Sequence, residues 1–194
     1  KEIELNNLRS QLNPHFIFNA LNSIRALVDE DPKKSKNAIT QLSNILRNSL
    51  MVDRKRLIPF KEELETVKDY LGLESVRYEE RLKTRFDLDP KAEDYLIPPL
   101  MIQTLVENAI KHGISTLRQG GEVAIKSFIN NESLVIQIRN AGQYENGKNK
   151  VREGYGLVNT RKRLELIYGN QSRFEIKNED KNTVLTEIVI PKTL

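Results

Sequence analysis

A histidine and two asparagines interrupt an apolar helical pattern near the start of the chain, within residues 13–22. Leucines recur at steps of three and four residues over 5–12, as on a buried helix face, and the same steps then lead to His15 and Asn19. A histidine at such a position can stay accessible while the helix is anchored, which suits a nucleophile. Pro14 adds a local conflict, because a proline inside a helix costs about 3 kcal/mol. An ordinary surface histidine is the alternative interpretation.

A second polar group follows an apolar run, over residues 107–113. In a helix that begins after Pro99, Asn108 and Lys111 lie one turn apart, on the side opposite the apolar residues. An amide oxygen is a suitable ligand for Mg²⁺, and a lysine beside it can contact phosphate. The alternative is an ordinary amphipathic helix in which Lys111 and His112 complement the negative end of the helix dipole.

A third group contains two glycines, Gly154 and Gly156, just before a segment that reads as a helix rich in Arg and Lys. Glycine lets a backbone come close to an anion, and the free N–H groups of a first helical turn bind phosphate oxygens. The polar, basic loop before them, residues 142–153, could fold over a polyanion. A flexible loop that merely ends a hairpin has the same composition, so both readings stay open.

Hydrophobic periodicity predicts the elements that must position these groups. The apolar stripe of the first helix is expected to resume at Ile17, Leu21, Ile24 and Val28. Helices are predicted over 1–29, 35–51, from Pro59 onward, 100–112 and 157–168, and strands over 82–88, 123–130, 134–139, 173–177 and 184–190.

The order of these elements predicts an α+β protein with two domains. Residues 1–80 read as a helical hairpin with a connecting helix, which is half of a four-helix bundle. Such a half buries its apolar stripes poorly alone, so we expect a homodimer that completes the bundle. Residues 81–194 mix helices with adjacent hairpin strands, which is typical of a two-layer α/β sandwich.

Composition narrows the class of protein. The 194 residues, 38% of them hydrophobic, can form packed cores, and the absence of cysteine excludes disulfides and thiolate metal sites and fits a reducing compartment. No run reaches the roughly eighteen apolar residues of a membrane span, and no signal peptide is visible. Because the sequence begins at Lys1 rather than at methionine, we expect it to be a piece of a longer protein.

The charge pattern disfavours one further class. The 31 basic and 27 acidic residues are interspersed and give a net charge of +4, which is typical of a solvated surface. The basic residues form no block and few aromatic residues lie between them, so we do not expect a nucleic-acid partner. Nucleic-acid binding through this surface would instead show a steep dependence on salt.

Taken in order, the three groups resemble the LytS/YehU-type sensor histidine kinases of bacterial two-component systems. The first reads Pro-His-Phe-Ile-Phe-Asn-x-Leu-Asn, the second Glu-Asn-Ala-Ile-Lys-His-Gly, and the third Gly-Tyr-Gly-Leu-x-Asn-x-x-x-Arg-Leu. The first is specific to that family, whereas the other two are shared with the wider GHKL-type ATP-binding fold. Residues 71–77, Pro99 and Gln103 agree with the family pattern as well, and the resemblance covers nearly the whole chain.

This resemblance implies a kinase core that autophosphorylates His15 from ATP and passes the phosphoryl group to an aspartate of a response-regulator receiver domain. Asn108 would bind Mg²⁺, with Lys111 and His112 beside the phosphates, and Asn19 could hydrogen-bond the imidazole ring or a water. The second glycine box would correspond to Gly154, Gly156, Leu157 and Asn159. The chain would then be the cytoplasmic portion of an inner-membrane-anchored bacterial protein, whose sensor region lies outside this sequence.

The first glycine box departs from the family pattern Asp-x-Gly-x-Gly. Here it reads Asn140-Ala141-Gly142-Gln143-Tyr144, with asparagine in place of the aspartate and tyrosine in place of the last glycine. An asparagine carbonyl can accept from the adenine amine, but it lacks the charge that strengthens such a bond. A dimeric signalling scaffold without kinase activity is therefore the alternative. No acidic residue follows His15, so the group that deprotonates the ring stays open.

Overall fold

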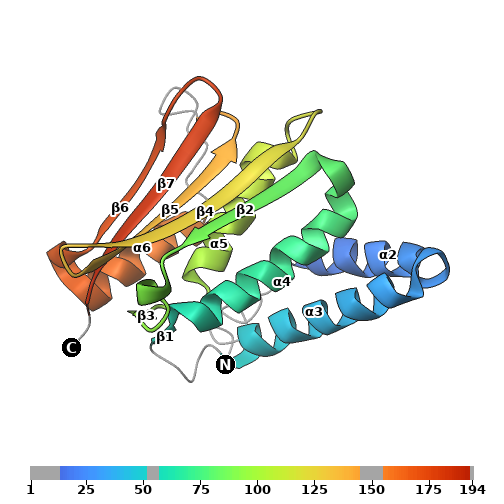
Figure 1. Ribbon diagram of the computed structural model, residues 1–194, viewed down its shortest axis with the longest axis horizontal. Helices are drawn as coiled ribbons and strands as arrows, with labels where there is room; N and C mark the ends of the chain where they lie inside the picture. The colour runs from blue at the N-terminus through green and yellow to red at the C-terminus, as the bar shows by residue number, and fades with distance from the viewer. Residues whose placement is uncertain (1–13, 52–56, 145–154, 193–194) are drawn as a thin grey trace.

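The computed structural model describes residues 14–51, 57–144 and 155–192, and a five-stranded sheet forms one of its layers (Figure 1). The strand order is β2-β4-β5-β7-β6; neighbours are antiparallel except β2 and β4, which pair in parallel. The β4–β5 turn forms at Asn131 and Glu132, both with positive φ, as a two-residue hairpin turn of this twist requires. All five predicted strands are confirmed: β2 Leu82–Leu88, β4 Gly121–Asn130, β5 Ser133–Ala141, β6 Arg173–Asn178 and β7 Thr183–Pro191.

Two helices cover one face of this sheet, α5 (Met101–Ala109) and α6 (Tyr155–Tyr168) (Figure 1). Branched aliphatic side chains of the strands pack against apolar side chains of α5, which is the pattern that makes a two-layer sandwich stable. This confirms the predicted α/β sandwich. The fully buried residues at this contact include Ile102, Val106, Val123, Ile125, Ile136, Ile138 and Ile188.

Three further helices, α2 (Pro14–Glu30), α3 (Pro32–Met51) and α4 (Phe60–Tyr78), make up the N-terminal part. Asp31 alone separates α2 from α3, which form the predicted hairpin (Figure 1). The helix α4 packs against this hairpin and also against α5 and β2, so that one continuous core joins the two parts of the chain.

Short elements connect these units. β1 (Ile58–Pro59) pairs with β3 (Leu96–Ile97), and Pro59 lies just before α4 rather than within its first turn. The 3₁₀ segments are η2 (Glu79–Arg81), η3 (Pro90–Ala92) and η5 (Gly169–Gln171), and η4 (Ile110–Ile114) is a π-helical turn that continues α5.

The stripe predicted for the first helix is only partly correct. Ile24 is buried, but Leu21 and Val28 are 50% and 49% exposed. The face that packs on the rest of the chain consists instead of Phe16, Ala20, Ile24 and Leu27. The helix therefore carries two apolar stripes, and periodicity alone does not say which one faces its own chain.

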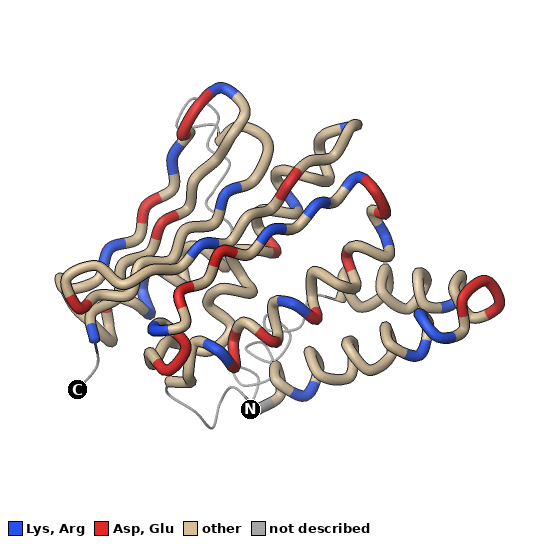
Figure 2. The backbone as a smooth tube through the Cα atoms, viewed as in Figure 1, with Lys and Arg blue, Asp and Glu red and all other residues tan. Residues whose placement is uncertain are grey.

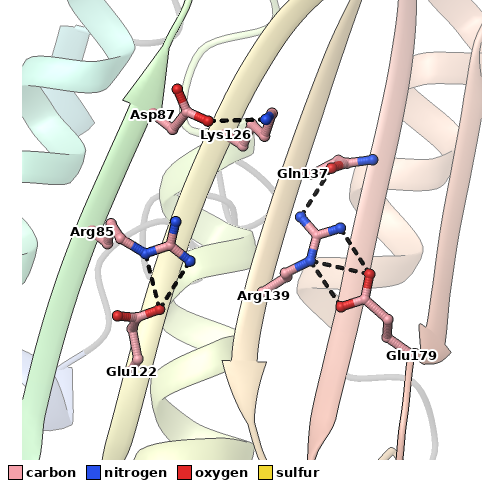
Figure 3. A network of polar contacts seen from close by, with 7 residues as sticks. All are labelled: Arg85, Asp87, Glu122, Lys126, Gln137, Arg139 and Glu179. Atoms are coloured by element: carbon pink, nitrogen blue, oxygen red, sulfur yellow. Dashed lines mark hydrogen bonds and ion pairs between the residues drawn. The ribbon is translucent and has the colours of Figure 1, made fainter.

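Charged residues of both signs recur along the strands (Figure 2). Two ion pairs join β2 and β4, Arg85 with Glu122 at 3.1 Å and Lys126 with Asp87 at 3.0 Å (Figure 3). Arg139 of β5 pairs with Glu179, which lies beyond the end of β6, at 2.8 Å (Figure 3). Cross-strand pairs of opposite charge stabilise a solvated sheet face modestly. These pairs place part of the mixed charge of the sequence on a solvated sheet face.

Candidate functional site

The helix α5 changes its winding just where its polar residues come. The α-helix ends at Ala109, and Ile110–Ile114 continue as a π-helical turn in which the Ser115 N–H donates to the Ile110 carbonyl at 2.9 Å. Such turns are rare in proteins, and those that occur often lie at functional sites. Asn108 is half-buried, while Lys111 and His112 lie exposed on the turn itself. The imidazole ring of His112 is nevertheless partly desolvated by its neighbours. This desolvation and the nearby Lys111 cation lower the pKa of His112, which favours its neutral form.

The first glycine box lies directly against this π-helical turn. A Cβ on Gly113 would come within 2.5 Å of the Ala141 carbonyl and 2.6 Å of the Asn140 amide nitrogen, so only glycine permits this approach. Gly142, with φ +127°, lies beside Gly113 in turn. The Asn140 amide nitrogen donates to the Ala141 carbonyl at 3.0 Å. The side-chain oxygen of Asn140, Oδ1, accepts no hydrogen bond within the described residues, which leaves it available to a ligand.

The chain after Gly142 is fixed to the turn between β6 and β7. The Gly142 N–H donates to the Asn182 carbonyl at 2.9 Å. The Asn178 side chain both accepts from the Tyr144 N–H at 2.7 Å and donates to the Tyr144 carbonyl at 2.8 Å. Tyr144, which replaces the expected glycine, therefore has both backbone polar groups paired.

The second glycine box lies on the other side of α5, where α6 begins. A Cβ on Gly156 would come within 2.8 Å of the Thr104 methyl group, so the start of α6 packs closely on α5. Leu157 is 4% exposed and its side chain belongs to the core, whereas Asn159 is exposed. Gly154 and the rest of the predicted phosphate loop, residues 145–153, lie outside the described residues.

His15 lies on α2, where it is exposed beside an anchoring contact. The neighbouring Phe16 is 6% exposed and packs on Tyr70 of α4, with ring centroids 4.9 Å apart. The Asn19 side-chain nitrogen lies 3.1 Å from His15 Nδ1. The predicted accessibility of His15 is confirmed, whereas the leucines predicted to be buried before it lie outside the described residues. Pro14 is the first described residue, so its effect on the preceding turn lies outside them as well.

The structure brings the sequence-predicted residues together in two places. Asn140 and Gly142 at the end of β5 meet the π-helical turn that carries His112, and Gly156 meets α5 one turn before Asn108. His15 and Asn19 form a separate pair on α2, in the helical part of the chain (Figure 1). Among the described residues, no hydrogen bond joins His15 to Asn108 or Lys111.

Sequence reasoning missed a group of buried acids between α4 and α5. Glu63 and Glu74 of α4 are 1% and 3% exposed, and Glu107 of α5 accepts from the Gln103 amide at 2.8 Å. Burial raises the pKa of Glu74 to about 7, against the weaker effect of Arg77, whose guanidinium lies 3.8 Å away. A usable signal exists: Glu63 and Glu74 share the three- and four-residue steps of the apolar positions of α4.

The buried Glu74 predicts a loss of stability as the pH rises from about 4.5 to about 7. Its pKa in the folded chain lies above the ordinary value of 4.5, so its stabilisation is fully present below 4.5 and is lost as pH rises through about 7. We expect the free energy of unfolding to fall by at most about 3 kcal/mol for this group. In Glu74→Gln this part of the pH dependence should vanish, leaving the parts that come from Glu63 and Glu107, whose pKa values are also raised by burial.

Urea unfolding at about pH 5 and about pH 8 measures how the free energy of unfolding depends on pH in the wild type and in Glu74→Gln. Glu65→Gln is the matched control, since Glu65 lies on the same helix and is exposed beside Lys68. An unchanged slope in Glu74→Gln would show that Glu74 does not titrate in this range.

Comparisons with known proteins show that the chain is similar to histidine kinases. The sequence model of the family described as Histidine kinase matches residues 3–82. Sensor protein LytS of Staphylococcus saprophyticus is 35% identical over 94% of this chain and 33% of its own length. Sensor protein LytS of Enterococcus faecalis is 33% identical over 98% of this chain and 34% of its own. The chain thus spans about a third of the length of these relatives.

Solved structures share its fold at low identity. Histidine kinase AdeS of Acinetobacter baumannii superposes with a TM-score of 0.51 at 17% identity, covering 92% of this chain and 96% of that chain. The catalytic domain of histidine kinase ThkA gives 0.53 at 20% identity, over 71% of this chain and 96% of that one. The sequence matches support a LytS-type histidine kinase over nearly the whole chain, and the fold agrees with that of solved histidine kinases.

Proposed function

We propose that the chain is the kinase core of a two-component sensor, which transfers the γ-phosphoryl group of ATP to His15. One observation carries the proposal: three segments distant in sequence, 104–113, 140–142 and the start of α6, converge in a chain that also presents an anchored, accessible histidine. Residues 1–80 would serve as the dimerisation and phosphoacceptor domain and residues 81–194 as the ATP-binding domain.

The residues at this convergence fit a magnesium–nucleotide. Asn108 would offer an amide oxygen to Mg²⁺, which supplies charge neutralisation at the phosphates when bound. Lys111 would contact a phosphate oxygen, with the neutral His112 beside it. The free carbonyl oxygen of Asn140 would accept from the adenine amine, and Gly142 and Gly156 would let the backbone come close to the ligand.

The contact with Asn19 would control which nitrogen of His15 attacks. With the amide nitrogen donating to Nδ1, the ring proton of a neutral histidine lies on Nε2. A half-turn of the Asn19 amide presents its oxygen, which accepts from Nδ1–H and leaves the Nε2 lone pair free. Nε2 would then form the bond to phosphorus as the bond to the ADP oxygen breaks, and the ring proton would pass to solvent.

The phosphohistidine would be relayed to an aspartate on a response-regulator receiver domain. A solved relative supports this step: histidine kinase ThkA in complex with response regulator protein TrrA superposes on this chain with a TM-score of 0.52 at 18% identity. Because the chain spans a third of its curated relatives, we also propose that it is the cytoplasmic portion of a membrane-anchored sensor. Recovery of the full-length protein in the soluble fraction would contradict the anchor. None of the described helices is long and apolar enough to cross a membrane.

The second apolar stripe of the hairpin supports a homodimer. On α2, Phe18, Leu21 and Val28 are exposed, and on α3, Ile39 and Leu50 are exposed. A second copy of the hairpin would bury these side chains in a four-helix bundle.

Leu21→Glu should therefore convert a dimer into monomers, because a buried charge opposes association. Sedimentation velocity measures the change. Leu166→Glu is the matched control, since Leu166 is 83% exposed on α6, outside the hairpin. A monomeric wild-type chain at micromolar concentration would contradict the proposed dimer.

Incubation with labelled ATP and Mg²⁺ tests the proposed function directly. A kinase incorporates label that is stable to alkali and labile to acid, as expected of a phosphohistidine. The rival is a signalling scaffold, favoured by Asn140 and Tyr144 in the first glycine box. A nucleotide titration with and without Mg²⁺ separates them, because the scaffold would bind weakly or not at all. A chain that binds no nucleotide and incorporates no label is a scaffold.

A further inference from the structure

The helix α5 begins without a cap of its own. Its N-cap residue is Leu100, held in the left-handed region at φ 59°, and no side chain of the helix caps its first turn. The first N–H groups of any helix need acceptors from elsewhere, and a buried N–H without one is costly. The side chain of Leu100 has no oxygen that could accept from these N–H groups, and neither have those of Pro98 and Pro99 before it.

The missing acceptors come from another helix. One carboxylate oxygen of Glu63, on α4, accepts from the Leu100 N–H at 2.8 Å, and the other accepts from the Gln103 N–H at 3.1 Å. In a capping box, two side chains of the same helix share these two donors. Here a single carboxylate, 1% exposed, takes both. Burial raises its pKa to about 7, opposed by these backbone N–H groups and by Arg163.

The same point also receives α6. Arg163 of α6 donates to the Pro99 carbonyl at 2.8 Å, next to the residue that Glu63 caps. Three helices therefore meet at one buried joint. Two of them, α5 and α6, carry residues of the proposed nucleotide site.

Contacts extend from this joint in both directions. Toward the site, the Gln103 side chain donates to Glu107, the residue before Asn108. Toward the hairpin, α4 is held by α3, because Asn48 donates to Thr66 at 2.7 Å and Asn44 donates to Asp69 at 3.0 Å. The placement of α5 relative to the hairpin thus depends on α4. At the N-terminal end of α5 it depends on Glu63 in particular.

We propose that Glu63 is a positioning residue for nucleotide binding, which caps α5 from α4 and thereby fixes the helix that carries Asn108. The proposal rests on the proposed function insofar as α5 binds the nucleotide. Glu63 touches no substrate; it acts through the placement of α5. A cap within α5 would stabilise that helix equally well but would not tie it to α4.

Glu63→Gln, compared with Glu65→Gln on the same helix, tests this in the whole chain. The glutamine keeps the size of the side chain but turns an N–H₂ group toward one of the two backbone donors. MgATP affinity is measured by calorimetry in the cold, where circular dichroism shows a native fold for each variant. We expect the dissociation constant to rise about tenfold in Glu63→Gln and to stay unchanged in Glu65→Gln. Glu63→Asp, which keeps the charge, should recover part of the affinity.

Two results are decisive. A lower melting temperature with a wild-type dissociation constant in Glu63→Gln would overturn the positioning role, because a purely structural cap changes only the folded fraction. If the wild-type chain binds no MgATP, the proposed function fails, and amide exchange then decides on Glu63. Faster exchange that reaches residues 108–112 supports the positioning role, whereas faster exchange confined to residues 100–103 overturns it.

Discussion

Replacing His15 with glutamine should abolish the incorporation of phosphate from ATP while leaving MgATP binding intact. Glutamine has no ring nitrogen to accept the phosphoryl group, and no step of the proposed reaction can proceed without one. His15 lies on α2 and touches none of the residues assigned to the nucleotide among those described. We therefore expect the MgATP dissociation constant to change by less than about twofold, as for independent sites.

The label retained on an alkali-treated gel and lost from a parallel acid-treated gel measures the first effect, and calorimetry measures the second. Asn19→Ala is the informative comparison, because it removes the partner of the ring and keeps the ring. It should slow incorporation by about tenfold or more, the scale at which losing a partner that orients a histidine acts. Full incorporation in His15→Gln would place the acceptor on another residue.

Replacing Asn108 with alanine should reduce phosphate incorporation by about two orders of magnitude, the scale at which loss of one group that stabilises transferring charge acts. The proposed role of Asn108 is to bind Mg²⁺, so its loss should remove the gain in nucleotide affinity that Mg²⁺ provides. Affinity for ATP without Mg²⁺ should stay close to that of the wild type.

Six titrations measure this, with and without Mg²⁺ for the wild type, for Asn108→Ala and for a control variant. Asn170→Ala is the matched control, because Asn170 is exposed after α6 and lies outside the proposed site. An Asn108→Ala chain that still gains affinity from Mg²⁺ as the wild type does would assign the metal to other ligands.

The elements were predictable because their signals are local. Pro59 and the Pro98–Pro99 pair come just before helices, and alternation over 82–88 predicted the strand β2. The site residues were assigned by resemblance, and the structure places Asn140 and Gly142 against Gly113. Spacing along the chain could not have shown it, since these residues are about thirty positions apart.

What could not be predicted depends on contacts between elements. The spacing of Glu63 along α4 places it on the buried side of that helix, but its role could not be predicted, because the uncapped start of α5 that it serves lies about forty residues away in the sequence. Leu21 and Val28 read as core, yet they are exposed because Phe16 and Leu27 occupy the face toward α4 and α3. The π-helical turn after Ala109 has no local signal at all, since its sequence suits an α-helix.

A single residue, Asp31, connects α2 to α3, and its polar groups are hydrogen-bonded to both helices. The Asp31 N–H donates to the Leu27 carbonyl, its own carbonyl accepts from Ser35, and its side chain accepts from the Lys34 N–H. The Ser35 hydroxyl reaches back to the Ile24 carbonyl. These hydrogen bonds tie the end of α2 to the start of α3. We therefore expect a rotation of α2 to be transmitted to α3 instead of being absorbed in the turn.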